Sequence, residues 1–171
     1  RSTSQMVEKI RVAVESRSDP NFLIIARTDA RTTLGLDEAL RRAEAYARAG
    51  ADLLFVESPE SIDEMHTICR SFDLPLVANM VEGGRTPVLT QQELVELGYS
   101  LAIFPAAAFL AGAAAFEGVY QTIKRTGSSV GGSTPLHDFA AFSQLMGFDW
   151  VQDFDERHAQ SDEAPASGQT R

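Results

Sequence analysis

The sequence is poor in cysteine, in histidine and in basic side chains. Its 171 residues include 1 cysteine, 3 histidines and 15 lysine and arginine residues, against 24 aspartate and glutamate residues. The single cysteine, Cys69, excludes an intrachain disulfide framework. Because it falls within a helical pattern, we expect a buried thiol that packs as a small apolar side chain. The formal net charge of -9 argues against nucleic acid and against an anionic membrane surface as partners.

Long apolar runs and metal-binding histidine pairs are absent as well. No run reaches the roughly 18 apolar residues of a membrane-spanning helix, and no secretory signal is visible. His66 falls within a helical pattern, His137 follows Pro135 in a turn, and His158 borders the C-terminal tail. No two of them have the spacing of metal ligands. We therefore expect exposed or helix-capping histidines and an intracellular protein, cytoplasmic or, in a eukaryote, mitochondrial.

The most informative feature is a set of four short apolar runs that each end in a polar or conformationally special residue. The first ends at Arg27 and Asp29, the second at Glu57, the third at Asn79 and the fourth at Pro105. Continuous apolar runs of this length are typical of strands in a parallel sheet. In barrels built from such strands, the functional site lies at their C-terminal ends. The pattern therefore predicts a site that these four ends share.

Amphipathic helical patterns separate the runs. Residues 36–49 place their apolar side chains on one face, and further helices are expected at residues 1–17, 58–72 and 90–97. Ser61 and Thr90 are expected as N-caps. The alternation of strands and helices predicts an α/β fold with about four βα units, which is half of a (β/α)8 barrel, since a complete barrel needs about 250 residues.

Three parts are expected along the chain. Residues 1–127 form the partial barrel, residues 128–158 form a C-terminal helical extension, and residues 159–171 have a composition typical of a disordered tail. The extension carries an apolar and aromatic stripe at helical spacing between Phe139 and Trp150, which predicts packing in a core or at a subunit interface. Because Arg1 is not methionine and the barrel is incomplete, we expect the chain to be a fragment of a longer protein.

Several motifs resemble a known family. They are Ile24–Ala30 (IIARTDA), Gly35–Ala51 (GLDEALRRAEAYARAGA), Phe55–Ser58 (FVES) and Ala78–Pro87 (ANMVEGGRTP). Their order and separation resemble the C-terminal half of the isocitrate lyase and phosphoenolpyruvate mutase superfamily, above all its 2-methylisocitrate lyase and dimethylmalate lyase-like branch. The similarity is close from Met6 to about Gly127 and looser as far as His158.

The resemblance implies an enzyme that binds a Mg²⁺-complexed enolate or an oxalate-like α-keto acid and makes or breaks a C–C or P–C bond beside it. The metal-binding aspartates of the family, and its mobile loop with a catalytic lysine, would lie upstream of Arg1. We therefore expect Mg²⁺ as a cofactor but no metal ligand in this chain. The resemblance also implies a homo-oligomer, a dimer or tetramer, in which a C-terminal helix crosses to a neighbouring subunit.

Two residues are expected to be catalytic. Arg27 matches a family arginine that binds the substrate carboxylate, and its planar guanidinium is suited to that task. A structural ion pair with Asp29 or Glu57 is the alternative. Glu57 matches a glutamate of the lyase branch and would hydrogen-bond the substrate hydroxyl or move its proton. Its alternative role is that of a structural partner for Arg27.

Four further positions are expected to contact substrate alongside these two. Asn79 would donate to a carboxylate, with the backbone of Met80 and Val81 beside it. Capping of the following turn is the alternative role of Asn79. Pro105 matches the lyase pattern at the last strand.

The departures from the family pattern narrow the expected substrate. Members that cleave tricarboxylates carry arginines near the positions of Leu110 and Leu136, which are apolar here. An unpaired carboxylate in an enclosed site is costly, so a smaller dicarboxylate is expected. We predict a Mg²⁺-dependent lyase that cleaves a C–C bond of a 2-hydroxy or 2-keto dicarboxylate through an enolate. The alternatives are oxaloacetate decarboxylation, phosphonate chemistry of the phosphoenolpyruvate mutase type, and a catalytically inactive half-barrel module.

Overall fold

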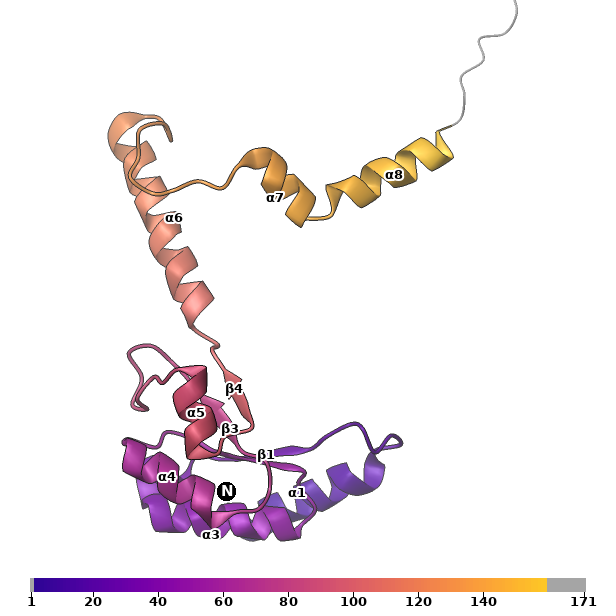
Figure 1. The fold of residues 1–171 in the computed structure, drawn as a ribbon, viewed down its shortest axis with the longest axis vertical. Coiled ribbons are helices and arrows are strands. Elements are labelled where there is room, and N and C mark those ends of the chain that lie inside the picture. The colour runs from indigo at the N-terminus through magenta and orange to yellow at the C-terminus, as the bar shows by residue number, and fades with distance from the viewer. Residues whose placement is uncertain (1, 160–171) are drawn as a thin grey trace, which may run out of the picture. The chain divides into compact units, whose positions relative to one another are not determined.

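The computed structural model describes residues 2–159, and it divides the chain into two compact units, Arg1–Ala113 and Ala114–Arg171. The helix Ala107–Thr126 (α6) spans the boundary between them (Figure 1). The three-part division expected from composition stays a prediction, and its tail lies outside the described residues apart from Ala159. Among the described helices, none is both long and apolar enough to cross a membrane.

The four expected strands are present, and all of them are parallel. Strand β1 (Ile25–Thr28) pairs with β2 (Leu53–Val56), and β3 (Val77–Asn79) pairs with β4 (Leu101–Ile103). A parallel bridge between Leu54 and Leu76 joins the two pairs. The strands therefore follow one another in space in their order along the sequence, as expected for consecutive βα units.

The expected helices of the first unit are confirmed. They are α1 (Thr3–Ser16), α3 (Leu36–Arg48), α4 (Ile62–Ser71) and α5 (Gln91–Leu97). Helix α4 begins later than predicted because Ser61 is its N-cap and accepts a hydrogen bond from the Glu64 amide at 3.1 Å. Thr90 caps α5 in the same way and completes a capping box with Glu93. His66 of α4 is exposed, as expected.

A short helix between β1 and α3 was not predicted. Helix α2 (Ala30–Leu34) begins directly after Asp29 and has no side-chain cap. It ends at Gly35, whose φ of +87° is a backbone conformation that glycine adopts readily. Five residues are too few to show a helical period, so pattern analysis could not distinguish this turn of helix from a loop.

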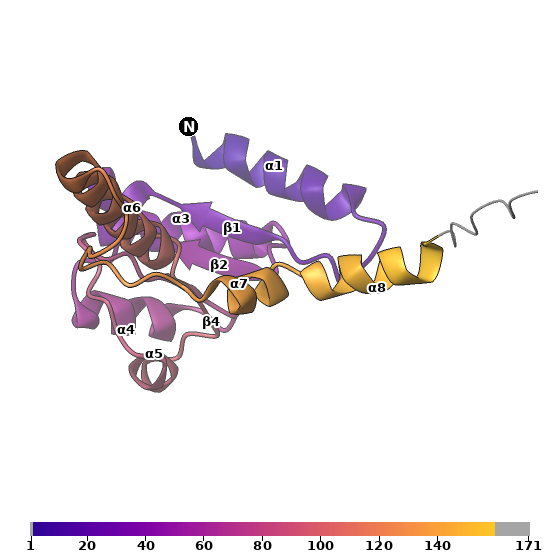
Figure 2. The same cartoon turned by 90° about the horizontal axis from the view of Figure 1, so that it is seen from above.

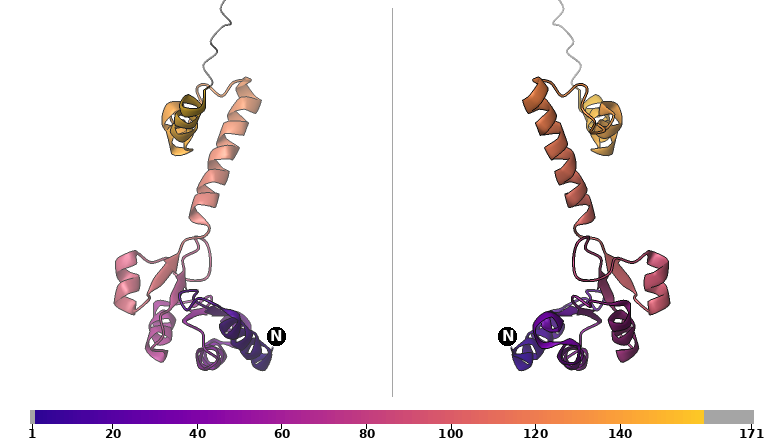
Figure 3. Two further views of the ribbon diagram at one scale, coloured as in Figure 1. Left: turned by 90° about the vertical axis from the view of Figure 1, so that its right-hand side faces the viewer. Right: turned by 90° about the vertical axis from the view of Figure 1, so that its left-hand side faces the viewer.

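The helices cover one face of the strands. Helix α3 packs against both β1 and β2, α1 packs on α3, and α4 contacts both α3 and α5 (Figures 2 and 3). The core on this face joins strand side chains to helix side chains; it includes Ala26, Leu54, Val56, Ala78 and Met80 from the strand segments and Ala39, Ala43, Tyr46, Met65, Ile68 and Leu94 from the helices. Cys69 is half-buried beside this core, and burial raises the pKa of its thiol to about 11.

The opposite face of the strands carries the alternate side chains. Leu53, Phe55 and Val77 form a small second cluster there. Because side chains alternate along a strand, the same face receives Arg27, which pairs in register with Phe55. It also receives the next alternate residue after Phe55, which is Glu57. The sheet therefore has one face for the core and one for polar side chains at the strand ends.

The second unit contains the C-terminal part of α6 together with α7 (Phe139–Leu145) and α8 (Phe148–His158). Gly147, with a φ of +82°, separates α7 from α8, so the predicted apolar stripe belongs to two short helices. Phe139 is 84% exposed and Trp150 is 65% exposed. The stripe is therefore not packed in a core of the described chain, and the expectation of a subunit interface stays a prediction.

Candidate active site

The three polar strand ends singled out in the sequence come together. The Arg27 Nη2 atom lies 3.2 Å from Glu57 Oε2, and the Asn79 Nδ2 atom lies 3.3 Å from the same oxygen. Arg27 belongs to β1, Glu57 follows β2, and Asn79 ends β3. Parallel pairing brings their C-terminal ends to one edge, and the alternation of side chains turns all three away from the helices. Glu57 is the residue that both others contact.

Arg27 is held from two sides and remains accessible. Its Nε and Nη2 atoms donate to Asp29 Oδ1 at 3.1 and 2.7 Å, and its guanidinium carbon lies 4.9 Å from the centre of the Phe55 ring. The hydrogen bond with Asp29, and then the charge of Glu57, raise the pKa of Arg27 above its ordinary value. The side chain is 47% exposed. The structural ion pairs therefore exist, and they leave room for an anion to approach.

Glu57 is more enclosed than Arg27. Its side chain is 14% exposed, and its amide donates to the Thr28 carbonyl at 3.0 Å, which extends the β1–β2 ladder by one residue. The chain then turns at Ser58, whose φ of +60° is unusual for a residue with a side chain. The Ser58 hydroxyl donates to Glu57 Oε1 at 3.1 Å. The sheet thus fixes the backbone of Glu57, and the hydroxyl at the turn holds one oxygen of its carboxylate.

Asn79 presents one satisfied and one unsatisfied polar atom. Its Nδ2 atom donates to Glu57 Oε1 and Oε2 at 3.4 and 3.3 Å. Its Oδ1 atom is buried and has no hydrogen-bond partner in the described part of the protein. The opposite amide orientation would place Oδ1 against the carboxylate, which is unfavourable while Glu57 is ionised. A buried acceptor without a donor costs about 1–3 kcal/mol, which is typical of a residue in a functional site.

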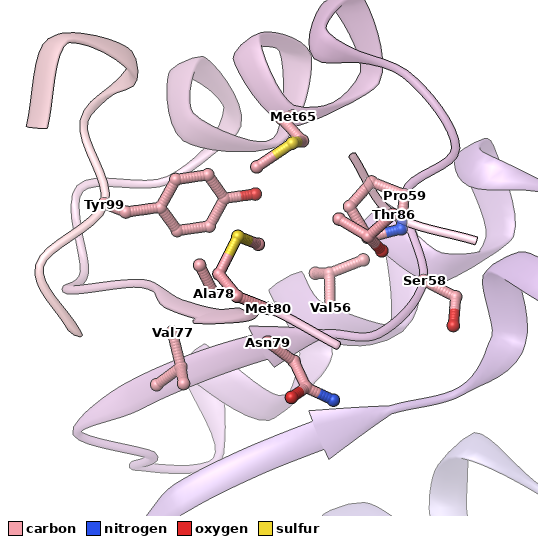
Figure 4. Close-up of a pocket in the computed structure, with 10 residues that line it drawn as sticks. All are labelled: Val56, Ser58, Pro59, Met65, Val77, Ala78, Asn79, Met80, Thr86 and Tyr99. Atoms are coloured by element: carbon pink, nitrogen blue, oxygen red, sulfur yellow. The ribbon is translucent and has the colours of Figure 1, made fainter. Parts of the chain in front are cut away.

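Two hollows lie near Asn79, and they differ in character. Figure 4 shows one beneath α4, where Met65, Met80 and Tyr99 gather while the Asn79 amide points away from them. Side chains fill this hollow and leave no space for a water molecule. The other has a volume of about 240 Å³ and is lined by Glu57, Ser58, Asn79, Val81, Gly84, Arg85 and Thr86. The second hollow is the candidate binding site.

The remaining predicted positions lie in different environments. Val81 lines the 240 Å³ hollow. Met80 is completely buried, and its amide donates to the Ile103 carbonyl at 2.9 Å, so that donor is already used within the sheet. Pro105 is exposed two residues beyond β4 and is not part of the lining of the hollow. The roles of all three in binding stay predictions.

A network of ion pairs beside the site was not predicted. Arg31 of α2 donates from Nε and Nη2 to Glu64 of α4 at 2.9 and 2.6 Å and also pairs with Glu60. Glu60 in turn lies 3.4 Å from the Nη1 atom of Arg85. The hydrogen bonds with Glu64 raise the pKa of Arg31 and lower that of Glu64. The network thus links the loops that follow β1, β2 and β3.

The residues of this site do not fit a metal ion. Mg²⁺ prefers an octahedral set of oxygen ligands, whereas the Glu57 carboxylate is engaged by the cation of Arg27 and by two neutral donors. Within residues 2–159 no group of three or more histidine, cysteine, aspartate or glutamate side chains is placed to hold a metal. An arginine, a carboxylate and an amide in contact can bind an anion and exchange a proton.

Comparison with known proteins identifies the family. The family described as phosphoenolpyruvate phosphomutase matches residues 1–124. The 2,3-dimethylmalate lyase of Eubacterium barkeri is 42% identical over 158 residues, which cover 92% of this chain and 55% of that protein. The 2-methylisocitrate lyase of Salmonella typhimurium is 45% identical over 130 residues, covering 74% of this chain and 43% of that protein.

A solved structure agrees with these relatives. Phosphonopyruvate hydrolase in complex with oxalate and Mg²⁺ superimposes with a TM-score of 0.82 at 28% identity, covering 94% of this chain and 57% of that one. The chain spans about half the length of the curated relatives it matches. It belongs to the phosphoenolpyruvate phosphomutase family, within the isocitrate lyase and phosphoenolpyruvate mutase superfamily.

Proposed function

We propose that this chain is the C-terminal half of a (β/α)8 barrel lyase that cleaves a C–C bond of a 2-hydroxy or 2-keto dicarboxylate through an enolate. The observation that carries the proposal is the convergence of Arg27 and Asn79 on Glu57 at the C-terminal ends of three parallel strands. The lyase names of relatives that are 42% and 45% identical to this chain over the aligned residues support the same reaction class.

The half-barrel is supported by the face of the sheet that the helices do not cover. Ile25, Leu101 and Ile103 are 46%, 42% and 37% exposed, and strand alternation places them on the same face as the site. Apolar strand residues of this kind fill the interior of a closed barrel. Strands β1 and β4 each leave an unpaired edge at which further strands would continue the sheet.

Arg27 would bind one substrate carboxylate. A guanidinium with two parallel N–H groups matches a carboxylate, and it stays charged at any physiological pH. Because the side chain is 47% exposed, a carboxylate can reach it without disrupting the core. The charge that develops on the enolate as the bond breaks would lie in the field of this cation.

Glu57 would take the proton of the substrate hydroxyl. As that O–H bond breaks, the oxygen becomes the carbonyl of one product, and the C–C bonding pair moves onto the other fragment as its enolate. A carboxylate within hydrogen-bond reach of a hydroxyl is suited to this step. Asn79 Nδ2 and the Ser58 hydroxyl hold the carboxylate in place, at 3.3 and 3.1 Å.

Mg²⁺, oligomerisation and cellular location belong to the same proposal. The complex of phosphonopyruvate hydrolase with oxalate and Mg²⁺ supports Mg²⁺ as a cofactor. Its ligands would lie outside the residues of this chain, and the ion would supply positive charge near a bound carboxylate. A homo-oligomer formed through the exposed C-terminal helices and a cytoplasmic location stay predictions.

The test is turnover of a panel of 2-hydroxy and 2-keto dicarboxylates by the full-length protein with Mg²⁺, followed as release of a 2-keto acid. Arg27→Ala should lower kcat/KM by at least about 100-fold, since it removes a charged contact to substrate and to the developing charge. Arg48→Ala, which removes an exposed arginine of α3, is the control. Full activity of Arg27→Ala would contradict the proposal.

Phosphonate chemistry is the second candidate, because a phosphonopyruvate hydrolase shares the fold at a TM-score of 0.82. Phosphonopyruvate and oxaloacetate therefore belong in the substrate panel. Phosphate release with no cleavage of hydroxy acids would favour phosphonate chemistry. Release of CO₂ from oxaloacetate alone would favour a decarboxylase, and no turnover by a folded protein would favour an inactive module.

A further inference from the structure

The hollow beside Glu57 is lined by a cation, Arg85, which belongs to the motif Ala78–Pro87 but to which the sequence analysis assigned no role. Arg85 lines it together with Glu57, Asn79 and Val81, and it lies in the glycine-containing loop that follows β3. Arg85 and Glu57 are the charged residues among those that line the hollow. Arg27 does not line the hollow itself, but it contacts Glu57, which does. An acid with one carboxylate on Arg27 that extends past Glu57 into the hollow would therefore bring its other end to Arg85.

Arg85 is weakly held in its present position. Its Nη1 atom lies 3.4 Å from Glu60 Oε1, whereas a strong charge-assisted hydrogen bond is about 2.7–2.9 Å long. Glu60 has a closer partner in Arg31, and the Arg85 side chain is 58% exposed. The guanidinium can thus leave Glu60 for another anion at little cost, because an exposed and long ion pair of this kind contributes little to stability.

Asn79 alone cannot bind the second carboxylate of a dicarboxylate ligand. Its Nδ2 atom already donates to both oxygens of Glu57, and its Oδ1 atom is an acceptor that would repel a carboxylate. A dicarboxylate in this hollow would also face the negative charge of Glu57. Its far carboxylate therefore needs a cation of its own, and Arg85 is the cation that lines the same space.

We propose that Arg85 is the specificity-determining residue that binds the second carboxylate of a dicarboxylate substrate, exchanging its contact with Glu60 for one with the ligand. This inference rests on the function proposed above, and it names the feature of the substrate that the site selects. In this proposal the 3.4 Å contact with Glu60 is the position of the guanidinium without ligand, and the guanidinium turns from there to the ligand carboxylate.

A purely structural role for Arg85 makes a different prediction. If Arg85 acted by tying the loop after β3 to the loop after β2, then removing Glu60 would have the same effect as removing Arg85. If Arg85 binds the ligand, Glu60→Gln frees it and leaves or improves binding. The pair of variants therefore separates the two roles.

The experiment uses the full-length protein and four variants: Arg85→Gln, Arg85→Lys, Glu60→Gln and, as a charge-matched control, Arg48→Gln. The first readout is the kinetics of the best dicarboxylate substrate and of the analogue in which a carboxamide replaces its far carboxylate. Arg85→Gln should raise KM for the dicarboxylate about 10- to 100-fold, the loss expected for one charge-assisted contact, with kcat changed less than about threefold. It should leave KM for the carboxamide unchanged, and Arg85→Lys should restore part of the loss.

The second readout is equilibrium binding of succinate, with propionate as the monocarboxylate control, and it does not depend on turnover. Arg85→Gln should weaken succinate binding by about the same factor and leave propionate binding unchanged. If no substrate is turned over but succinate binding still depends on Arg85, the proposed function fails and the role of Arg85 stands.

Three outcomes would overturn the role of Arg85. One is an Arg85→Gln variant that turns over the dicarboxylate with an unchanged KM and binds succinate with an unchanged affinity. Another is an equal loss in Glu60→Gln and Arg85→Gln, which would show a structural role. The third is wild-type protein that binds succinate no more tightly than propionate.

Discussion

Replacing Arg31 by methionine removes a cation that two carboxylates share. Arg31 donates to Glu64 through two hydrogen bonds of 2.9 and 2.6 Å and also pairs with Glu60. The side chains of Arg31 and Glu64 are 16% and 22% exposed. Because methionine keeps much of the aliphatic volume of arginine and adapts to irregular gaps, the change in stability reports on the ion pairs and not on a cavity.

Two known cases set the limits for the loss of stability in Arg31→Met. Exposed ion pairs contribute about 0–1 kcal/mol, whereas removal of one partner from a buried pair costs about 3–5 kcal/mol. The Arg31–Glu64 pair is largely enclosed, while Glu60 is 40% exposed and can be solvated when Arg31 is lost. We expect the free energy of unfolding to fall by about 2 kcal/mol at pH 7. Urea denaturation of the full-length protein measures it, with Arg70→Met on the exposed side of α4 as the control.

The stability difference between wild type and Arg31→Met should depend on pH, and the pKa of Glu64 gives the direction of that dependence. Hydrogen bonding by Arg31 lowers the pKa of Glu64 in the folded protein below its ordinary value of 4.5. A lowered pKa contributes stability that is complete above the unfolded pKa and is lost as the pH falls through the folded pKa. The difference between wild type and Arg31→Met should therefore be complete at pH 7 and shrink below about pH 4. A difference under about 0.5 kcal/mol at pH 7, or one that persists unchanged at pH 3, would refute the reasoning.

Three further substitutions test the site and its scaffold. Glu57→Gln keeps the shape of the side chain but removes the base, so kcat should fall about 10²- to 10⁴-fold in the keto-acid release assay, and a smaller loss would assign the proton to another group. Ser61→Ala removes the N-cap of α4 and should cost about 1 kcal/mol in urea denaturation, whereas Ser71→Ala near the end of the same helix should cost less. Gly98→Ala places a side chain at a φ of +108°, with its Cβ 3.4 Å from Cys69, and should cost about 1–2 kcal/mol; unchanged stability would show that the loop relaxes.

The strand ends were predictable because both signals they depend on are local. A short apolar run indicates a buried parallel strand, and the residue that interrupts it marks the C-terminal end, as at Arg27, Glu57 and Asn79. The period of two then places these residues on one face. Helices α3 and α5 were predicted for a similar reason, since each carries an apolar face and a recognisable end.

The ion-pair network was not predictable because its members are far apart in the sequence. Arg31 and Glu64 are 33 residues apart, and Arg85 and Glu60 are 25 residues apart. Many charged side chains of this sequence could have formed such pairs, and only the fold, which brings the segments after β1, β2 and β3 together, selects these. Helix α2 itself was missed because its five residues show no period. The C-terminal stripe shows the converse, since its helical spacing was recognised but Phe139 and Trp150 are exposed in the described residues.

The charge balance around Arg27 bears on how an anionic substrate would enter. The Nη2 atom of Arg27 already faces two carboxylates, so a substrate carboxylate that binds through two parallel N–H groups, one of them on Nη2, would compete with one of these carboxylates. Asp29 is 67% exposed and returns to water when displaced, whereas Glu57 is 14% exposed and would lose its cation in an enclosed position. An unpaired charge costs more where it is less hydrated. Exchange with Asp29 is therefore favoured, and it preserves the contact between Arg27 and Glu57 that holds the proposed base in position.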